Sequence, residues 1–341
     1  MITRRCFASA IAFIQGACLV PVVHGATAAA SAPRGFTGPL VLALIAPSQE
    51  PEEVRARWLP LANKLARRLG VSVELEVSRQ YADVVKAAVS GRAHVAWLSN
   101  ASALEAVESG SAEVFATMQV RGPDGHALGG YRSQIVVRDD SSIRTVEDLL
   151  AKGKSLTLRM GDTKSTSGYL IPYYYLFARR GLNPVDMFKS VFTGSHADNM
   201  AAVISAKADA ATTNDEEVKK LAQRDTAGAQ RLRVVWSSQE IRQSPLLWST
   251  ALPLQVRTVI KDVVFGFGQT PPEQHALMEM NRIVKFVPSS NRQLQPIADI
   301  EMFTARRTLA SDTTLTPVQR SAAEAKINGR GTWLEMMLKR S

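Results

Sequence analysis

Residues 161–170 read Gly-Asp-Thr-Lys-Ser-Thr-Ser-Gly-Tyr-Leu, and the patterns on either side of this stretch decide the fold class. The alternating run Ser155–Met160 before it predicts a strand, and Tyr169–Arg180 after it predicts a helix. Gly181 follows as a C-cap signal. A strand, a short turn and a helix in series are the repeating unit of an α/β sheet.

The turn itself carries three consecutive hydroxyl side chains, those of Ser165, Thr166 and Ser167. Backbone N–H groups at the start of a helix lack intrahelical partners and favour an anion, and the hydroxyls add donors at the same point. We therefore expect a site for a small tetrahedral oxyanion. The alternative is that Ser165 or Thr166 only caps the helix.

Strand and helix patterns also alternate on both sides of this unit. Toward the N-terminus, Pro39–Ala46 is a continuous apolar run, typical of a strand buried on both faces. The helix predicted after it, Glu50–Leu69, contains Pro60, which should bend or divide it. A glycine-rich loop at 122–130 precedes a second β/α series. Two such units predict an α/β protein with two lobes, mixed and mostly parallel sheets and a hinged cleft.

The boundaries follow from these patterns and from the polar, helical C-terminal part. We predict an export signal at 1–30, a first lobe at 31–133 and 246–285, a second lobe at 134–245, and a helical C-terminal extension at 286–341. A helix is expected over Glu273–Val284. The hinges should lie near Ser133–Val137 and Ser237–Leu247. The extension has no recognisable motif and is a candidate arm for a homodimer.

The N-terminus has the features of an export signal: Arg4 and Arg5, then an apolar stretch from Phe7 to Val23, then small residues. A twin-arginine route is one alternative for export. A lipid anchor on Cys18 ranks second, because Gln15 stands where that signal prefers an aliphatic residue. We predict a periplasmic location. Cleavage would remove both cysteines of the chain, so no disulfide is expected.

Charge and composition narrow the function further. The chain of 341 residues carries a net charge of +10, which favours anionic ligands. No block of Lys and Arg interleaved with aromatics suggests nucleic-acid binding. The five histidines are too dispersed for a zinc motif, and Gly153-Lys154-Ser155 lacks the earlier glycine of a P-loop. No metal or cofactor is therefore predicted.

The chain resembles the periplasmic phosphate, phosphite and phosphonate-binding proteins of ABC importers. The matching pieces include Ser-Thr-Ser-Gly-Tyr-Leu at 165–170, Gly-Ser-His at 194–196, the run Tyr131–Val137 and the run Ala208–Glu216. The Ser-Thr-Ser-Gly turn followed by Gly-Ser-His is the most specific of them. The resemblance extends from about residue 39 to residue 265 and implies the two-lobed type II periplasmic-binding-protein fold.

This resemblance implies that the three hydroxyls hold the ligand headgroup with His196 opposite, and that Tyr131 and Tyr81 line the cleft. The imidazole and the phenol groups can each donate to an oxyanion. His196 could instead cap a helix beginning at Ala197, and Tyr81 could merely begin its own helix.

The resemblance also implies that Glu216, or Asp215 beside it, accepts a hydrogen bond from a protonated ligand oxygen or from a ligand ammonium. The alternative is that both carboxylates only supply favourable charge in the first turn of a helix. Aminophosphonate binders of the family carry another acidic residue near the position of Ser244, and this chain does not. Phosphate, phosphite and alkylphosphonates remain as expected ligands.

The predicted function is a solute-binding protein that delivers a phosphorus oxyanion to the permease of an ABC importer in the inner membrane. A subunit that senses the ligand for a membrane sensor kinase would share the same fold and site. A hydrolase could be drawn from Ser165 or Ser167 with His196 and Asp198. The sequence lacks a G-x-S-x-G elbow, however, so no enzyme is predicted.

Overall fold

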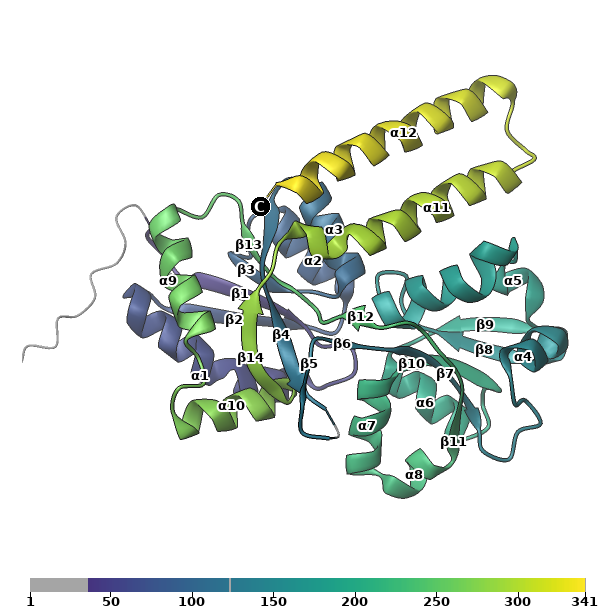
Figure 1. Ribbon diagram of the computed structural model, residues 1–341, viewed down its shortest axis with the longest axis horizontal. Coiled ribbons are helices and arrows are strands. Elements are labelled where there is room, and N and C mark those ends of the chain that lie inside the picture. Colours follow the sequence, from purple (N-terminus) through teal and green to yellow (C-terminus); the bar gives the residue numbers. More distant parts are fainter. Residues whose placement is uncertain (1–35, 123, 341) are drawn as a thin grey trace, which may run out of the picture.

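The computed structural model describes residues 36–122 and 124–340, which form two α/β lobes and a long helical hairpin (Figure 1). The export signal predicted at 1–30 lies outside the described residues. Within the described part of the chain, no helix combines the length and apolar character needed to cross a membrane.

The first lobe is built on a seven-stranded sheet with the order β14-β4-β13-β3-β1-β2, in which β5 pairs with the far end of β4. Its strands are β1 (Leu40–Ile45), β2 (Val73–Ser78), β3 (Val95–Trp97), β4 (Ala112–Arg121), β5 (Ala127–Leu128), β13 (Leu246–Ser249) and β14 (Ile283–Pro288). Its helices are α1 (Pro51–Leu69), α2 (Tyr81–Val89), α3 (Asn100–Glu108), α9 (Leu254–Phe265) and α10 (Pro271–Asn281).

Strand β1 shows why this sheet needs helices on both faces, because all six of its residues are buried. Leu42 and Leu44 pack in the cluster formed with α1, α9 and α10, whereas Ala43 and Ile45 pack in the cluster formed with α2 and α3. Successive side chains of a strand point to opposite faces, so a continuous apolar run is stable only between two layers.

The second lobe is built on a five-stranded sheet with the order β11-β7-β10-β8-β9. Its strands are β7 (Ser133–Arg138), β8 (Thr157–Met160), β9 (Ser190–Thr193), β10 (Ala210–Asn214) and β11 (Leu232–Ser237). Its helical segments are α4 (Val146–Lys152), η1 (Gly153–Ser155), η2 (Thr166–Leu170), η3 (Tyr173–Phe177), η4 (Ala178–Arg180), α5 (Pro184–Met187), α6 (His196–Ile204), α7 (Asp215–Arg224) and α8 (Thr226–Gln230).

A two-stranded ribbon joins the lobes. Strand β6 (Gly130–Tyr131) leads from the first lobe to the second, and β12 (Ile241–Arg242) leads back. The two pair antiparallel, with Ile241 opposite Tyr131, so both chain crossings lie side by side between the sheets (Figure 1). Adjacent short crossings are the usual form of a hinge between lobes.

The prediction of mostly parallel sheets is wrong in part. The pairs β1–β2, β1–β3, β8–β9 and β8–β10 are parallel. The strands β13 and β14 lie antiparallel to their neighbours in the first sheet, and β7 lies antiparallel to β10 and β11 in the second. The physical reason is connectivity: β7 and β13 follow directly on the two crossings and enter their sheets without a right-handed crossover helix.

Two local expectations also need correction. Helix α1 is not divided at Pro60, where the proline leaves only the carbonyl of Ala56 without its usual donor, and both residues are exposed to solvent. The helix predicted over Glu273–Val284 ends at Asn281, because Arg282 takes a left-handed conformation (φ 56°). Strand β14 then begins at Ile283 and crosses the boundary predicted for the C-terminal extension.

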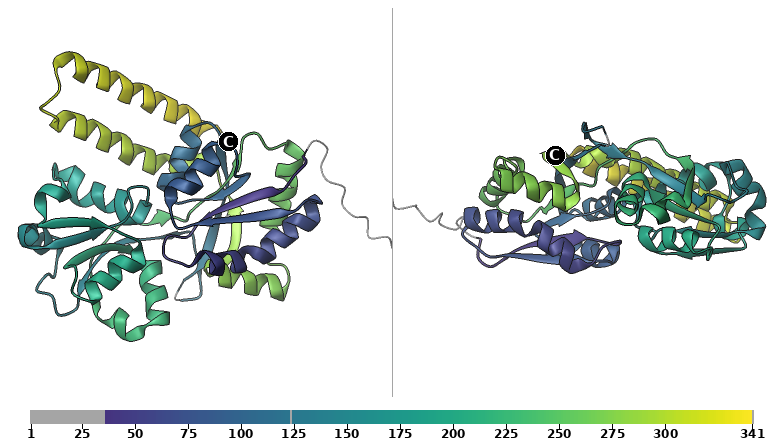
Figure 2. Two further views of the ribbon diagram at one scale, coloured as in Figure 1. Left: turned by 180° about the vertical axis from the view of Figure 1, so that it is seen from behind. Right: turned by 90° about the horizontal axis from the view of Figure 1, so that it is seen from below.

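After η5 (Asn291–Leu294), helices α11 (Gln295–Ser311) and α12 (Pro317–Lys339) form a hairpin. The base of the hairpin is fixed to the first lobe, where Arg330 bonds Glu108 on α3 at 2.7 and 2.8 Å and Glu301 on α11 at 2.6 Å. The view from behind shows it leaving the first lobe and running beside the second (Figure 2). Phe303 on α11 meets Tyr174 of η3 edge to face, with ring centroids 5.2 Å apart.

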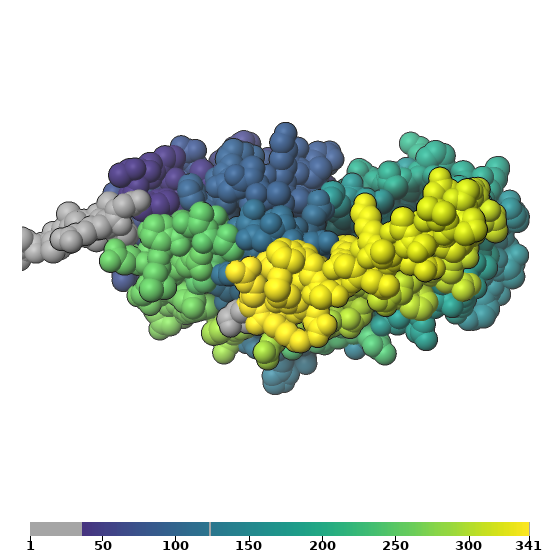
Figure 3. Space-filling model, turned by 90° about the horizontal axis from the view of Figure 1, so that it is seen from above, coloured from purple at the N-terminus to yellow at the C-terminus, as the bar shows by residue number. Residues whose placement is uncertain are grey.

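Seen from above, the hairpin spans both lobes (Figure 3). The distal half of α11 therefore contacts the second lobe while its proximal half is buried against the first.

Candidate oxyanion-binding site

The Ser-Thr-Ser turn is held by a close contact between two glycines. The N–H of Gly161, at the end of β8, donates to the carbonyl of Gly168 at 2.8 Å, and the hydroxyl of Thr212 on β10 donates to the same carbonyl at 2.6 Å. A Cβ added to Gly161 would lie 2.7 Å from the Cα of Gly168, so this approach requires glycine.

This arrangement explains why the predicted helix does not begin as an α-helix. The carbonyl of Gly168 is bound by groups outside the helix, and the carbonyl of Ser165 accepts from the N–H groups of both Tyr169 and Leu170 at 3.1 Å. The bond to Leu170 spans five residues, so η2 is a turn of π-helix, a form found often at functional sites. The helix therefore starts at Thr166 rather than at Tyr169.

The three hydroxyls of the turn are buried and have different partners. Ser165 accepts from the N–H of Gly168 at 3.1 Å, so it caps the turn as the simpler alternative proposed. Thr166 accepts from the N–H of Ala101 on α3, in the first lobe, at 2.8 Å. Ser167 lies 3.2 Å from Asn214 Nδ2 and 3.4 Å from His196 Nε2. Each oxygen that accepts a bond still has its hydroxyl hydrogen available as a donor.

The turn lies in a cleft between the lobes. A small cavity of about 90 Å³ is bounded by Ser165, Thr166 and Ser167 from the second lobe and by loop and strand ends of the first. A wider part of the cleft, of about 370 Å³, shares Tyr81, Ser165 and His196 with it and is also lined by Gly194. The remaining lining residues of the small cavity include Ile45, Pro47, Ser48, Gln49, Tyr81, Trp97, Ser99, Tyr131, His196, Asn214, Glu216, Glu217, Lys220, Gln243 and Ser244.

Both predicted tyrosines line this cavity. Tyr81 is the first residue of α2 and Tyr131 ends β6, and both are buried. Burial raises the pKa of Tyr81 to about 12, and burial together with the nearby carboxylate of Glu216 raises the pKa of Tyr131. Both phenols are therefore neutral donors throughout the physiological pH range.

His196 is the first residue of α6 and does not cap it. The N-cap is Ser195, whose hydroxyl accepts from the N–H of Asp198 in a capping box. The imidazole is buried, and burial lowers its pKa, opposed in part by Glu217. Its Nε2 faces Asn214 and Ser167, so the ring belongs to the cavity and is uncharged at neutral pH.

The two neighbouring carboxylates take different positions. Glu216 lines the cavity and accepts from Gln243 Nε2 at 2.7 Å, and burial raises its pKa. Asp215 does not line the cavity. It accepts from the N–H of Arg132 at 2.8 Å and from Lys219 at 3.0 Å, because successive residues at a helix start project in different directions.

Sequence reasoning missed several residues of the cavity. Pro47 and Ser48 follow β1, Trp97 and Ser99 end and follow β3, and Gln243 lies after β12. The buried Ser48 Oγ and Trp97 Nε1 have no hydrogen-bond partner among the described residues. The available signal was the rule that ligands bind beyond the carboxyl ends of strands, which applies to β1 and β3 as well as to the second lobe.

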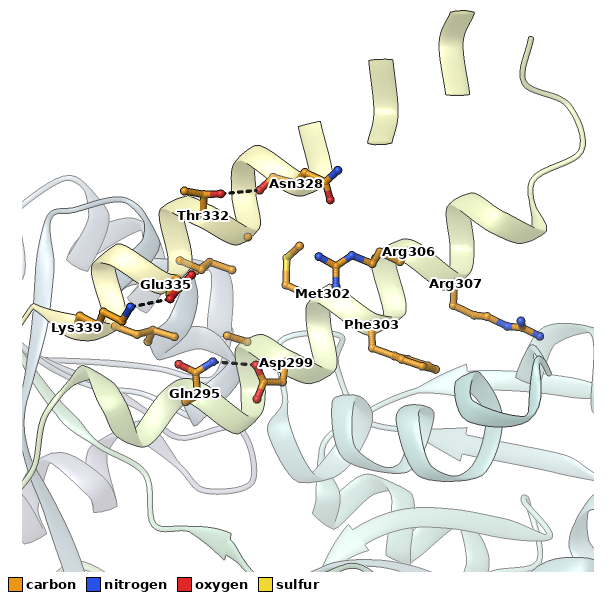
Figure 4. A pocket seen from close by; sticks show the side chains of 14 residues that line it. Gln295, Asp299, Met302, Phe303, Arg306, Arg307, Asn328, Thr332, Glu335 and Lys339 are labelled. Atoms are coloured by element: carbon orange, nitrogen blue, oxygen red, sulfur yellow. Dashed lines mark hydrogen bonds and ion pairs between the residues drawn. The ribbon is translucent and has the colours of Figure 1, made fainter. Parts of the chain in front are cut away.

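A larger cavity, of about 950 Å³, lies elsewhere, between α11 and α12 (Figure 4). Side chains of Met302 and Arg306 point into the space between the two helices, while Phe303 and Arg307 point toward the second lobe. This groove contains none of the hydroxyls or aromatic donors of the inter-lobe cleft.

Comparison with known proteins identifies the family of the chain. The family described as "ABC transporter, phosphonate, periplasmic substrate-binding protein" matches residues 43–294. The phosphonates-binding periplasmic protein of Escherichia coli K12 is 32% identical over 283 residues, covering 83% of this chain and 82% of that protein. A phosphate-import protein of Mycolicibacterium smegmatis is 25% identical over 236 residues, covering 67% of this chain and 71% of that protein.

Solved structures extend the comparison. A binding protein component of a phosphonate ABC transporter from Pseudomonas aeruginosa has a TM-score of 0.78 at 30% identity and covers 88% of this chain and 98% of its own. A protein from Prochlorococcus marinus, in complex with methylphosphonate, has a TM-score of 0.65 at 21% identity, with 77% of this chain and 96% of its own covered. This chain, with its type II periplasmic-binding-protein fold, belongs to the family of periplasmic phosphonate-binding components of ABC transporters.

Proposed function

We propose that the inter-lobe cleft binds the tetrahedral headgroup of a phosphorus oxyanion through Ser165, Thr166, Ser167, His196 and the two tyrosines, and that the closed protein delivers the ligand to an ABC permease. The observation that carries the proposal is the convergence of three buried hydroxyls and two neutral phenols on one small cavity. These hydroxyl and phenol groups supply several preorganised hydrogen-bond donors in one place, which suits a compact anion.

Ligand choice depends on Glu216. Burial raises the pKa of its carboxyl, and Gln243 occupies one of its oxygens, so the carboxyl suits a ligand oxygen with which it can share a proton. A ligand ammonium would need a negative charge in the cavity, and Ser244 supplies none. The carboxylates that line the cavity are those of Glu216 and Glu217, and Glu217 is already bonded to Lys220 at 2.8 Å. We therefore propose phosphate, phosphite or a short alkylphosphonate in preference to an aminophosphonate.

Closure would take place by rotation of the lobes about the β6–β12 ribbon. Three bonds already join α3 of the first lobe to the turn of the second: Ala101 N–H to Thr166, and the Ser99 and Ser102 hydroxyls to the carbonyl of Lys164 at 2.8 and 3.0 Å. Bonds that cross the cleft next to the ligand site support a receptor that encloses its ligand. We also propose that the α11–α12 hairpin is a dimer arm, on the basis of the partly exposed Trp333 and Met336 on α12.

The geometry favours a receptor over a hydrolase. The carboxylate of Asp198 bonds Ser195 at 2.7 Å, where it completes the cap of α6, and makes no bond to the His196 ring. A Ser–His–Asp triad needs the acid to orient the imidazole, so these residues do not form one.

Calorimetric titration tests the proposal with phosphate, phosphite, methylphosphonate, 2-aminoethylphosphonate and sulfate. We expect one phosphorus oxyanion to bind at least tenfold more tightly than sulfate and 2-aminoethylphosphonate. Alanine at Ser165 should weaken that binding by about 10- to 100-fold, since it removes a donor to a charged ligand. Alanine at His196 should also weaken it, because it removes the ring that contacts Ser167 and Asn214 beside the ligand. Binding of all five anions with equal affinity, or unchanged affinity in both variants, would contradict the proposal.

A further inference from the structure

The described residues place one side chain, Asn214, behind both Ser167 and His196. Asn214 is the N-cap of α7 and is 6% exposed. Its amide makes three bonds: Oδ1 accepts from the N–H of Glu217 at 2.9 Å, and Nδ2 lies 3.2 Å from both Ser167 Oγ and His196 Nε2. Every hydrogen of the amide is thus directed at a residue of the cavity.

The orientation of this amide follows from its bond to the backbone. The N–H of Glu217 can only donate, so the atom that faces it must be Oδ1. The NH₂ group must then point at Ser167 and His196, where it can only donate. Because His196 Nε2 faces a donor, it presents its lone pair, and the proton of the neutral ring lies on Nδ1.

The same reasoning determines the direction of the Ser167 hydroxyl. Its oxygen accepts from Asn214 at 3.2 Å, so its own hydrogen turns away from Asn214. The competing acceptor, His196 Nε2, is at the long distance of 3.4 Å and already faces the Asn214 amide, which leaves the hydroxyl hydrogen for an oxygen of the ligand. The main chain of Ser167 is fixed independently, because its carbonyl accepts from the Ser133 hydroxyl at 2.6 Å. The bond from the Asn214 amide therefore favours a Ser167 hydroxyl that acts as a donor toward the cavity.

We propose that Asn214 is the positioning residue of this site: it directs the Ser167 hydroxyl toward the oxyanion and holds His196 as a neutral ring that carries its proton on Nδ1. This inference rests on the proposed function. Charged and titratable groups around the ring are Glu217 and Lys220 on α7, Asp198 on α6, Asp162 before η2 and Tyr81 on α2. Glu217 and Lys220 bond each other at 2.8 Å, whereas Nε2 contacts two uncharged groups, the Asn214 amide at 3.2 Å and the Ser167 hydroxyl at 3.4 Å.

Two substitutions separate this role from capping. Asn214→Asp keeps the cap, because one carboxylate oxygen still accepts from the N–H of Glu217, but it places an acceptor opposite Ser167 and His196. Asn214→Ser also keeps a capping oxygen and removes the NH₂ group without adding charge. Asn183→Asp is the matched control, since Asn183 caps α5 through the N–H of Val185 and does not line the cavity.

The first measurement needs no ligand. Long-range ¹⁵N–¹H NMR of the histidine ring nitrogens reports the tautomer, and the His196 signals are assigned by their loss in His196→Gln. We expect Nδ1–H in the wild-type chain and in Asn183→Asp, a mixture of tautomers in Asn214→Ser, and Nε2–H or a doubly protonated ring in Asn214→Asp. An Nε2–H tautomer in the wild-type chain, or no change in either Asn214 variant, would overturn the proposal.

The second measurement is the affinity for methylphosphonate between about pH 6 and 8. The affinity of the wild type is divided by that of each variant at the same pH, because this ratio cancels the titration of the ligand itself. We expect Asn214→Ser to bind methylphosphonate about 5- to 30-fold more weakly than the wild type, and Asn214→Asp at least tenfold more weakly. The loss of affinity in Asn214→Asp should increase as the pH rises through the pKa of His196 in that variant. Equal affinity in wild type and Asn214→Ser would refute the role of Asn214. Failure of the wild-type chain to bind any phosphorus oxyanion would instead refute the proposed function, whereas the NMR result would stand.

Discussion

Replacing Gly161 with alanine tests whether the contact between Gly161 and Gly168 positions the ligand-binding turn. The new Cβ would lie 2.7 Å from the Cα, 2.8 Å from the carbonyl carbon and 3.0 Å from the oxygen of Gly168. All three are backbone atoms, which cannot rotate away. The turn would have to retreat by about 0.7 Å to restore an ordinary contact of 3.4 Å.

This displacement should affect stability and affinity together. Overpacking of this kind costs about 1–3 kcal/mol, which lowers the melting temperature by about 2–6 °C in a chain of this size. The same movement shifts the hydroxyls of Ser165 and Ser167, and loss of one hydrogen bond to a charged ligand costs about 1.5–3 kcal/mol, or about 10- to 100-fold in affinity.

Calorimetric titration with methylphosphonate and a thermal melt measure the two effects in the same preparation. Gly329→Ala serves as the control, because no atom lies within 4 Å of its Cβ position in α12, and alanine there should stabilise the helix by about 0.5–1 kcal/mol. A Gly161→Ala variant that melts and binds like the wild type would refute the claim that this contact sets the position of the turn.

Three further predictions follow from the cavity and the hairpin. Burial raises the pKa of Glu216, so the carboxyl stabilises the fold fully below its pKa in the unfolded chain and loses this contribution as the pH rises through its pKa in the folded chain. The melting temperature of ligand-free Glu216→Gln, relative to that of the wild type, should therefore increase from about pH 4 to pH 8. A difference in melting temperature that stays constant over this range would contradict the prediction. Because the pKa of Tyr81 is raised to about 12, its phenol stays protonated at both about pH 7 and about pH 9. Tyr81→Phe should therefore weaken methylphosphonate binding by the same factor at the two pH values, which calorimetric titrations at each pH would measure. Arg330→Ala should remove the bonds to Glu108 and Glu301. Urea titrations should then show an unfolding free energy lower by about 1–2 kcal/mol, because the lost group is half-buried, while ligand affinity stays unchanged. An altered affinity would mean that the base of the hairpin is coupled to the cleft.

Much of the local structure could be read from residue patterns. The unbroken apolar run at Pro39–Ala46 predicted a strand buried on both faces, and β1 (Leu40–Ile45) is such a strand. The order of strands and helices predicted two α/β units, because periodicities of two and of 3.6 residues are local properties of the chain. The pairing direction of β13 and β14 was not predictable in this way, since it depends on which neighbours the chain meets after the crossings at β6 and β12.

For the site, the sequence by itself determined the chemistry of the turn: three hydroxyls after a strand, on a chain with excess positive charge. Tertiary structure alone decided which groups surround them. Ser48 and Trp97 come from the first lobe, Glu216 rather than Asp215 faces the cavity, and Asn214 bonds two residues that lie 47 and 18 positions before it. The physical reason is that hydrogen bonds and burial act between groups that are close in space. Folding of the second lobe brings Asn214 to Ser167 and His196, and the meeting of the two lobes brings Ser48 and Trp97 to the same cavity.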